Sequence, residues 1–209
     1  MKINRIYPAD SGAIASFETK NNLIRSQIVN SIMREPNFYD KIDKLRYIFL
    51  NGLASVEKGI GTEGGYGYDY GFIFSEDAYA KPSVTRHLID GQFYDIPAFT
   101  DDTTRLSPTV HITKLAQCTT YASEVSSILN NCGIQCEKVT KAQMCLNLRE
   151  GRLARIGHQF NGVQLRKKGK LYYIDVTADI MKRDAENAGF DVDLSKLDRN
   201  AKCARIKHE

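Results

Sequence analysis

Hydrophobic residues recur every three to four positions near the start of the chain, a spacing that predicts two amphipathic helices. The first helix covers residues 11–34 and ends before Pro36, whose ring cannot continue a helix. The second covers residues 39–56 and stops near Gly59, a residue suited to a helix end. We therefore expect residues 1–60 to form a helical N-terminal part that packs against the rest of the chain.

The same spacing returns after Cys118 and predicts a third helix of roughly four turns. Gly133 follows it, where a residue that is free to adopt a positive φ ends a helix. The apolar face consists of Tyr121, Ala122, Val125, Ile128, Leu129 and Cys132. The polar face consists of Ser123, Glu124, Ser127, Asn130 and Asn131.

Two runs of aromatic and β-branched residues flank the polar loop 166–169 and predict a β-hairpin. In the register that this loop sets, Asp175 lies opposite Phe160, and His158 lies opposite Thr177. His158 and Asp175 then share one face as diagonal neighbours with Cβ atoms ~7–8 Å apart, which a hydrogen bond spans if the strands twist or bulge. The pattern predicts that these two side chains meet.

The third helix and the hairpin carry a thiol, an imidazole and a carboxylate on Cys118, His158 and Asp175. Such a set makes and orients a sulfur nucleophile. Only the thiolate attacks, and an ordinary thiol with a pKa of ~8.5 is mostly protonated at neutral pH. Cys118 lies in the first turn of its predicted helix, where free backbone N–H groups and the helix dipole favour an anion by ~0.3–1 kcal/mol. We therefore expect Cys118 to be the most reactive cysteine.

Three motifs in this order resemble the transglutaminase-like superfamily of papain-related cysteine enzymes. Residues 118–122, Cys-Thr-Thr-Tyr-Ala, are similar to the family pattern Cys-x-Gly-Tyr-Ala. Residues 158–161, His-Gln-Phe-Asn, are similar to His-Ala-Trp-Asn, and residues 172–177, Tyr-Tyr-Ile-Asp-Val-Thr, to Tyr-x-Val-Asp-x-Thr. The resemblance covers residues 117–179, about a third of the chain. The glycine and the tryptophans of the family pattern are replaced here, which alters the expected cleft but leaves the triad intact.

The resemblance implies that Cys118 is the nucleophile, His158 the general base and acid, and Asp175 the residue that orients the histidine. It implies an enzyme that acts through a thioester on an amide of a protein or peptide, as a protease or isopeptidase, a deamidase or a transglutaminase. Two alternatives stay open. One is a catalytically inactive binding module that retains the fold, and the other is an acyltransferase of the arylamine N-acetyltransferase type.

Four further residues are candidate substrate contacts, namely Gln117, Tyr66, Tyr68 and Tyr70. The three tyrosines belong to the glycine-rich stretch 59–71, whose composition forbids a regular helix. The stretch is an exposed linker, a turn between short strands, or a flap over the cleft whose tyrosines touch substrate. A tetrahedral intermediate at the cysteine needs hydrogen-bond donors for its oxyanion. The Cys118 backbone N–H is one candidate, and Gln117 or a tyrosine of the stretch is the expected second.

The composition points to no special partner. Of the 209 residues 42% are hydrophobic and 26% charged, and the formal net charge is +4, with the basic residues dispersed. The mild, dispersed charge predicts no nucleic-acid partner. We expect no membrane partner either, since no run approaches ~20 apolar residues. The N-terminus lacks the apolar core of a Sec-type signal, which predicts a cytoplasmic protein or one exported by another route, as bacterial effectors are. No Cys-x-x-Cys pair occurs, so we expect no metal and no other cofactor.

No internal repeat or long linker divides the sequence, so we interpret residues 1–209 as a single transglutaminase-like domain with its catalytic core at residues 105–180. Between the third helix and the hairpin, residues 134–140 predict a strand, and residues 143–148 predict either another strand or a loop arm. The expected fold class is α+β, with N-terminal helices and a papain-like core in which the nucleophile helix packs on a small antiparallel sheet.

Overall fold

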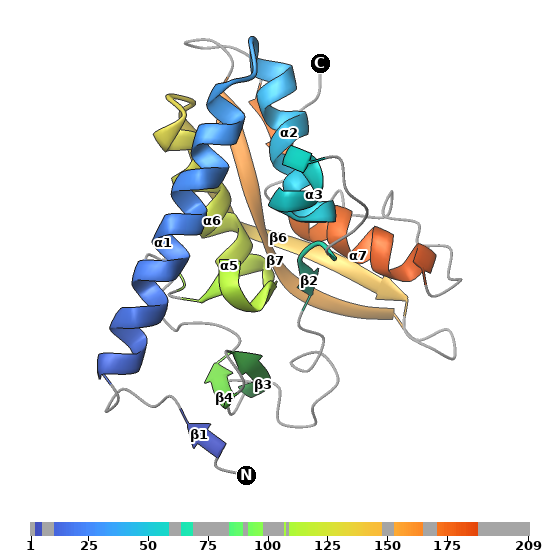
Figure 1. Ribbon diagram of the computed structural model, residues 1–209. Helices are drawn as coiled ribbons and strands as arrows, with labels where there is room; N and C mark the ends of the chain where they lie inside the picture. The colour runs from blue at the N-terminus through green and yellow to red at the C-terminus, as the bar shows by residue number, and fades with distance from the viewer. Residues whose placement is uncertain are drawn as a thin grey trace.

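Helices and short sheets are combined in an α+β arrangement (Figure 1). The computed structural model describes residues 3–5, 11–58, 64–68, 84–89, 92–97, 107, 109–147, 153–164 and 171–187. The helices are α1 (Ser11–Met33), α2 (Phe38–Asn51), α3 (Leu53–Lys58), α5 (Val110–Thr113), α6 (Cys118–Asn131) and α7 (Val176–Asn187). The strands are β1 (Ile3–Arg5), β2 (Gly67–Tyr68), β3 (Val84–Ile89), β4 (Gln92–Pro97), β5 (Leu115–Ala116), β6 (Cys136–Asn147), β7 (Leu153–Gln164) and β8 (Leu171–Ile174).

The N-terminal helices follow the predicted hydrophobic pattern, with one difference. The helix predicted over residues 39–56 is divided at Gly52, which has a φ of 87° and separates α2 from α3. Glycine adopts this conformation without the steric cost that a side chain would add. The Gly52 N–H still donates to the Ile48 carbonyl at 2.8 Å, so α2 ends with a paired backbone group.

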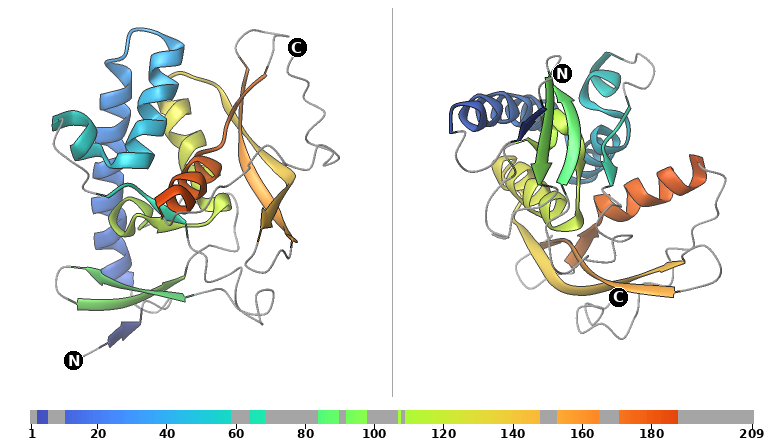
Figure 2. Two further views of the ribbon diagram at one scale, coloured as in Figure 1. Left: turned by 90° about the vertical axis from the view of Figure 1, so that its right-hand side faces the viewer. Right: turned by 90° about the horizontal axis from the view of Figure 1, so that it is seen from below.

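Helix α6 lies between the N-terminal helices and the largest sheet (Figures 1 and 2). It packs against β6 and β7 on one side and against α1 on another, and Gly133, with a φ of 74°, follows its C-terminal end as predicted. Because the helix is covered on more than one side, its predicted polar face is wrong in part. Ser123 and Glu124 are buried, and Glu124 has no exposed surface.

The largest sheet has the antiparallel order β6-β7-β8. The register predicted for the hairpin is confirmed, since Asn161 pairs with Ile174 and the flanking pairs follow in step. Strand β6 is longer than predicted and carries an irregularity between Val139 and Ala142, where it passes β7 next to His158. Such a bulge bends and twists a strand and thereby re-aims the side chains beside it.

The hairpin pairing stops at Ile174, one residue before the predicted carboxylate. The expectation that Thr177 continues the strand opposite His158 is wrong, because Thr177 lies in the first turn of α7. Asp175 starts that helix, since its Oδ1 accepts the Ala178 backbone N–H at 3.0 Å. An aspartate in this position is a strong N-cap and ends the strand.

Part of the glycine-rich stretch is packed in the protein interior. Within the stretch 59–71, the structure describes residues 64–68, where β2 pairs in parallel with β5 immediately before α6. A Cβ atom on Gly65 would lie 1.9 Å from the Leu50 carbonyl oxygen, so only glycine fits there. Arg183 of α7 fixes the same segment by donating to that carbonyl at 2.7 Å. These five residues are therefore tied to α2 and α7.

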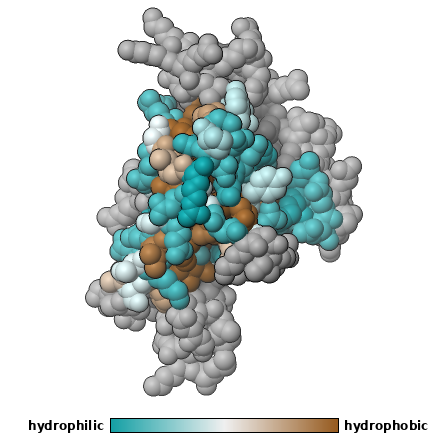
Figure 3. Space-filling view, turned by 45° about the horizontal axis from the view of Figure 1, so that its top comes forward, coloured by the Kyte–Doolittle hydropathy of each residue, from teal (hydrophilic) through white to brown (hydrophobic). Residues whose placement is uncertain are grey.

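A second three-stranded sheet completes the fold. Strands β3 and β4 form an antiparallel pair, and β1 joins β4 in parallel (Figure 1). The face seen in Figure 3 is mostly hydrophilic, with hydrophobic side chains showing between the polar ones. Large hydrophobic side chains that α1 and α2 leave exposed are Leu23, Met33, Tyr39 and Tyr47. In the described part of the chain, no helix has the length and apolar character to cross a membrane.

Candidate active site

Cys118 is the first residue of α6, as the sequence predicts. The preceding residue, Gln117, is extended with φ −103° and ψ 171°, and its side chain makes no capping hydrogen bond. The N–H groups of the first turn have no partner within a helix, so Cys118 lies at the positive end of the α6 dipole. The cysteine is buried, with 8% of its surface exposed.

His158 and Asp175 meet as predicted. The Nε2–H of His158 donates to Oδ2 of Asp175 over 2.6 Å. The Asp175 carboxylate is held on its other oxygen by the Ala178 N–H at the start of α7. The Phe160 ring stacks on the imidazole, with centroids 5.8 Å apart and an interplanar angle of 27°. The carboxylate, a helix start and an aromatic ring thus fix the orientation of the buried imidazole.

The second ring nitrogen of His158, Nδ1, is buried and has no well-directed hydrogen-bond partner. The imidazole nevertheless lies close enough to the Cys118 thiol to interact with it and to shift its titration. Loose alignment of this kind is common before substrate binds, and it tightens in the reacting complex. One ring nitrogen is therefore engaged by Asp175, and the other is available beside the sulfur.

Burial raises the pKa of the Cys118 thiol, but the opposing interactions are stronger in sum and the pKa falls below the ordinary thiol value. The largest of them is the interaction with His158, followed by hydrogen bonds from the Gln159 backbone and the Thr119 hydroxyl. Burial likewise lowers the pKa of His158, yet Asp175 and Cys118 raise it to about 9. Both shifts favour a thiolate–imidazolium pair at neutral pH.

Two other cysteines in the described part of the chain provide a contrast. Burial raises the pKa of Cys132, and burial raises the pKa of Cys136 to about 11. Both cysteines are buried as members of the hydrophobic core, and no histidine is among the groups that shift their pKa values. Of these three thiols, Cys118 is the one with a lowered pKa.

Asn161 fixes the strand that carries His158 against the helix that carries Cys118. Its Nδ2 donates to the Ala122 carbonyl at 2.8 Å and to the Ser126 hydroxyl at 2.9 Å. Asn161 is almost completely buried. These bonds join β7 directly to the second and third turns of α6, so they help to set the spacing of sulfur and imidazole.

The predicted substrate contacts fall in different environments. Gln117 is buried beside the cysteine, and its Nε2 has no hydrogen-bond partner. Tyr66 is buried, and its hydroxyl bonds to Nδ1 of His111 at 2.8 Å. Tyr68 is buried in β2, which pairs with β5 directly before Gln117. Tyr70 lies outside the described residues.

A second buried polar cluster lies on the other side of α6, and the sequence pattern does not reveal it. Arg25 of α1 makes two hydrogen bonds to Glu124 of α6, at 2.8 and 2.9 Å. Nε2 of His111 lies 3.2 Å from the same carboxylate, and Tyr66 occupies the other ring nitrogen. Asn21 accepts the His111 backbone N–H at 2.7 Å. Glutamate in an amphipathic helix normally faces solvent, so only contact information reveals this partner set.

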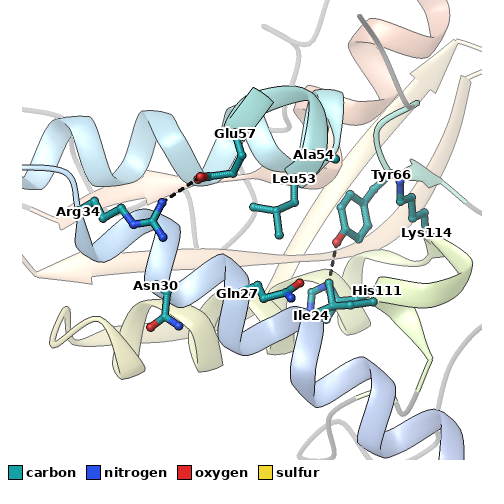
Figure 4. A pocket seen from close by; sticks show the side chains of 10 residues that line it. All are labelled: Ile24, Gln27, Asn30, Arg34, Leu53, Ala54, Glu57, Tyr66, His111 and Lys114. Atoms are coloured by element: carbon teal, nitrogen blue, oxygen red, sulfur yellow. Dashed lines mark hydrogen bonds and ion pairs between the residues drawn. The ribbon is translucent and has the colours of Figure 1, made fainter. Parts of the chain in front are cut away.

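A cavity of about 510 Å³ borders this second cluster and not the triad (Figure 4). In Figure 4 the Tyr66 hydroxyl points to His111, while the Arg34–Glu57 ion pair lies farther along α1 and α3. The lining residues are Ile24, Gln27, Asn30, Arg34, Leu53, Ala54, Glu57, Tyr66, His111 and Lys114. A concave cavity of this kind is the usual first candidate for a binding site. The thiol and the imidazole whose pKa values are shifted toward an ion pair lie instead at Cys118 and His158, which makes that position the candidate site.

Within the described ranges, no group of three or more histidine, cysteine, aspartate or glutamate side chains is arranged to hold a metal ion. No protein-family model matches the chain, and no curated protein matches it. The geometry around Cys118 is therefore the observation from which a function can be inferred.

Proposed function

We propose that this protein is a cysteine-dependent enzyme that acts on an amide bond of a protein or peptide through a thioester. The observation that carries the proposal is the asymmetry of His158. Its Nε2 is bound to Asp175 at 2.6 Å, whereas its Nδ1 has no such partner and the ring lowers the pKa of the neighbouring Cys118 thiol. A carboxylate-oriented imidazole beside a thiol is the arrangement of an activated sulfur nucleophile.

The resemblance to the transglutaminase-like superfamily supports the same assignment. It gives Cys118 the role of nucleophile, His158 the role of general base and acid, and Asp175 the role of orienting residue. The packing of α6 on the β6-β7-β8 sheet fits a papain-like core. The α+β character and this packing are the parts of the fold on which the proposal draws.

The reaction begins with the thiolate–imidazolium pair. Sγ of Cys118 attacks the amide carbon, the C–S bond forms, and an electron pair of the carbonyl moves to oxygen. As the oxyanion collapses, the C–N bond breaks and the His158 imidazolium gives its Nδ1 proton to the leaving nitrogen. A thioester and a neutral imidazole remain. Water or an amine then attacks the thioester and gives a proton to Nδ1, and the C–S bond breaks to restore the thiolate–imidazolium pair.

The attacking group and the substrate amide define three outcomes. Water on a backbone or isopeptide acyl group gives cleavage, and water on a glutamine side chain gives deamidation. An amine gives transamidation. The triad residues perform the same proton transfers in each case, so these three activities share one test for the nucleophile.

The test is mass spectrometry of glutamine- and lysine-containing peptides incubated with the protein and a labelled primary amine. We expect cleavage, the small mass gain of deamidation, or incorporation of the amine, and no product with the Cys118→Ala variant. A Cys132→Ala variant is the matched control, because Cys132 is also buried and has no histidine among the groups that shift its pKa. Equal product from the wild type and from Cys118→Ala would refute the proposal.

A binding module that retains this arrangement without turnover is a second candidate. It is favoured by the burial of Cys118, of which 8% is exposed. This alternative requires that peptide binding be independent of the thiol. It also requires that Cys118 react with small electrophiles no faster than Cys132 and Cys136. If that is measured, the binding module replaces the enzyme as the favoured function.

A further inference from the structure

The donor set for the oxyanion is the part of the reaction that the triad does not supply. We propose that the side-chain amide of Gln117 donates the second hydrogen bond to the oxyanion formed at Cys118. This inference rests on the proposed function and adds a catalytic residue to it. The carrying observation is a buried Nε2 atom without a partner, in the residue directly before the nucleophile.

Gln117 is the N-cap residue of α6, yet its side chain does not cap the helix. N-cap side chains normally satisfy one of the free N–H groups of the first turn. Instead, the Gln117 side chain is buried, with 7% of the residue exposed, and its Nε2 is unpaired. Buried polar atoms without partners are rare in native proteins, and each one calls for an explanation. A ligand atom that arrives during the reaction is such an explanation.

An oxyanion bound to the carbon attached to Sγ lies near the start of α6. The Cys118 backbone N–H belongs to the first turn, whose N–H groups have no partner inside a helix. Gln117 is the adjacent residue, so its donor and the Cys118 N–H start from neighbouring positions of the backbone. Two donors that converge on one oxygen in a buried site stabilise the charge as it develops.

The other candidate donors are less suitable. The Tyr66 hydroxyl is already engaged by His111 over 2.8 Å. The backbone of Gln159 contacts the Cys118 sulfur, but its unpaired side-chain atom is Oε1, an acceptor that would repel an oxyanion. Of these two glutamines, Gln117 is the one whose buried, unpaired side-chain atom is a donor.

In the step that this donor serves, the C–S bond forms while an electron pair of the carbonyl moves onto oxygen. The Nε2–H of Gln117 and the N–H of Cys118 donate to that oxygen, and neither proton is transferred. When the pair returns, the leaving group departs and the thioester remains. Loss of one donor should slow this step without changing the thiolate itself.

Two reagents separate these effects without a known substrate. p-Nitrophenyl acetate acylates the thiolate through an oxyanion and releases p-nitrophenolate, whereas iodoacetamide alkylates it by displacement of iodide with no oxyanion. In Gln117→Met, we expect the acylation rate of Cys118 to fall by about 100-fold or more. The iodoacetamide rate at the same cysteine should stay within about 2-fold of the wild-type rate, since the variant keeps the helix start and the imidazole.

The matched control is Gln135→Met, which makes the same substitution at an exposed glutamine after α6 and should leave both rates unchanged. Iodoacetamide labelling of the variants, followed by peptide mapping, also verifies that the site is folded. If Gln117→Met keeps the wild-type ratio of the acylation rate to the iodoacetamide rate, the inference is overturned while the enzyme proposal stands. A loss confined to Gln159→Met overturns it as well, because the donor would then be the other glutamine. A wild-type Cys118 that reacts with neither reagent overturns both proposals.

Discussion

Two histidine–carboxylate clusters border helix α6 and differ in how the imidazole is used. His111 is engaged at both ring nitrogens, by Glu124 and by Tyr66. His158 is engaged at one, by Asp175, and its other nitrogen is available beside Cys118. We call the cluster of His111, Glu124, Tyr66 and Arg25 the closed cluster, because these side chains are hydrogen-bonded to one another, as expected of a structural network. We call His158, Asp175 and Cys118 the open cluster, because Nδ1 of His158 is available to take up and release a proton.

The two carboxylates also differ, both in their exposure and in their partners. The Glu124 side chain has no exposed surface and is neutralised by Arg25 in a two-bond ion pair. The Asp175 side chain is 17% exposed, and its oxygens accept from a helix start and from His158. A buried histidine with a carboxylate partner is thus not enough to locate a catalytic site. The free second nitrogen and the adjacent thiol identify the candidate.

The largest effect is expected at the nucleophile. Cys118→Ala should lower turnover at least about 1000-fold, because it removes the thiol that the His158 imidazole activates. Its melting temperature should stay near that of the wild type, since the thiol is not a member of the closed cluster. Turnover assays with the peptide substrate, together with calorimetry, measure both quantities. Residual turnover above a tenth of the wild-type rate would contradict the assignment.

The next largest effect is expected on stability. Arg25→Ala leaves the Glu124 carboxylate buried without its cation, which should cost about 3–5 kcal/mol of unfolding free energy. Arg34→Ala is the matched control, because its ion pair with Glu57 is on the surface and should contribute no more than ~1 kcal/mol. Urea unfolding compares the two variants. Equal losses would mean that the closed cluster is not a structural network.

A smaller effect is expected where the open cluster is held together. Asn161→Ala removes both bonds between β7 and α6 and should lower turnover by about 100-fold, because small displacements of reacting groups are costly. Ser126→Ala keeps the bond to the Ala122 carbonyl and should lose much less. The ratio of the two kcat values is the measurement. Similar kcat values would show that this contact does not set the spacing of sulfur and imidazole.

The smallest effect is expected at Tyr66. Tyr66→Phe removes the hydrogen bond to His111 and should cost ~1 kcal/mol of stability. Because the hydroxyl is engaged in the closed cluster, the acylation rate of Cys118 should not change. Thermal unfolding and the p-nitrophenyl acetate assay check both points. A large loss of acylation would return Tyr66 to the list of substrate contacts.

The sequence pattern predicts the elements that local chemistry controls. The spacing of apolar residues predicts α1 and α6, and the length of the loop 166–169 predicts the pairing of Asn161 with Ile174. The meeting of His158 and Asp175 follows from that register. The prediction that the strand continues beyond Ile174 was wrong. The Asp175 side chain caps the start of α7 and thereby ends the strand pairing.

Features that depend on contacts between distant segments could not be predicted in this way. The apolar pattern predicts that Glu124 faces solvent, whereas in the structure Arg25 of α1 covers it. The break at Gly52 needs a positive φ that the apolar pattern does not encode. The packing of Gly65 against Leu50 ties a glycine-rich segment to α2, where composition alone suggested an exposed linker, a turn or a flap. Each of these is a tertiary effect that overrides a local preference.

The central claim is that His158 activates Cys118, and the pH dependence of alkylation tests it most directly. The Cys118 thiolate is lost as the pH falls through its lowered pKa, so its iodoacetamide rate should have a midpoint below the ~8.5 of an ordinary thiol. In His158→Ala, burial remains while the largest favourable interaction is lost, so the midpoint should move above that value. Peptide mapping across the pH range would give the rates for Cys118, Cys132 and Cys136 in one experiment. A midpoint for Cys118 that is ordinary in the wild type and unchanged in His158→Ala would contradict the account.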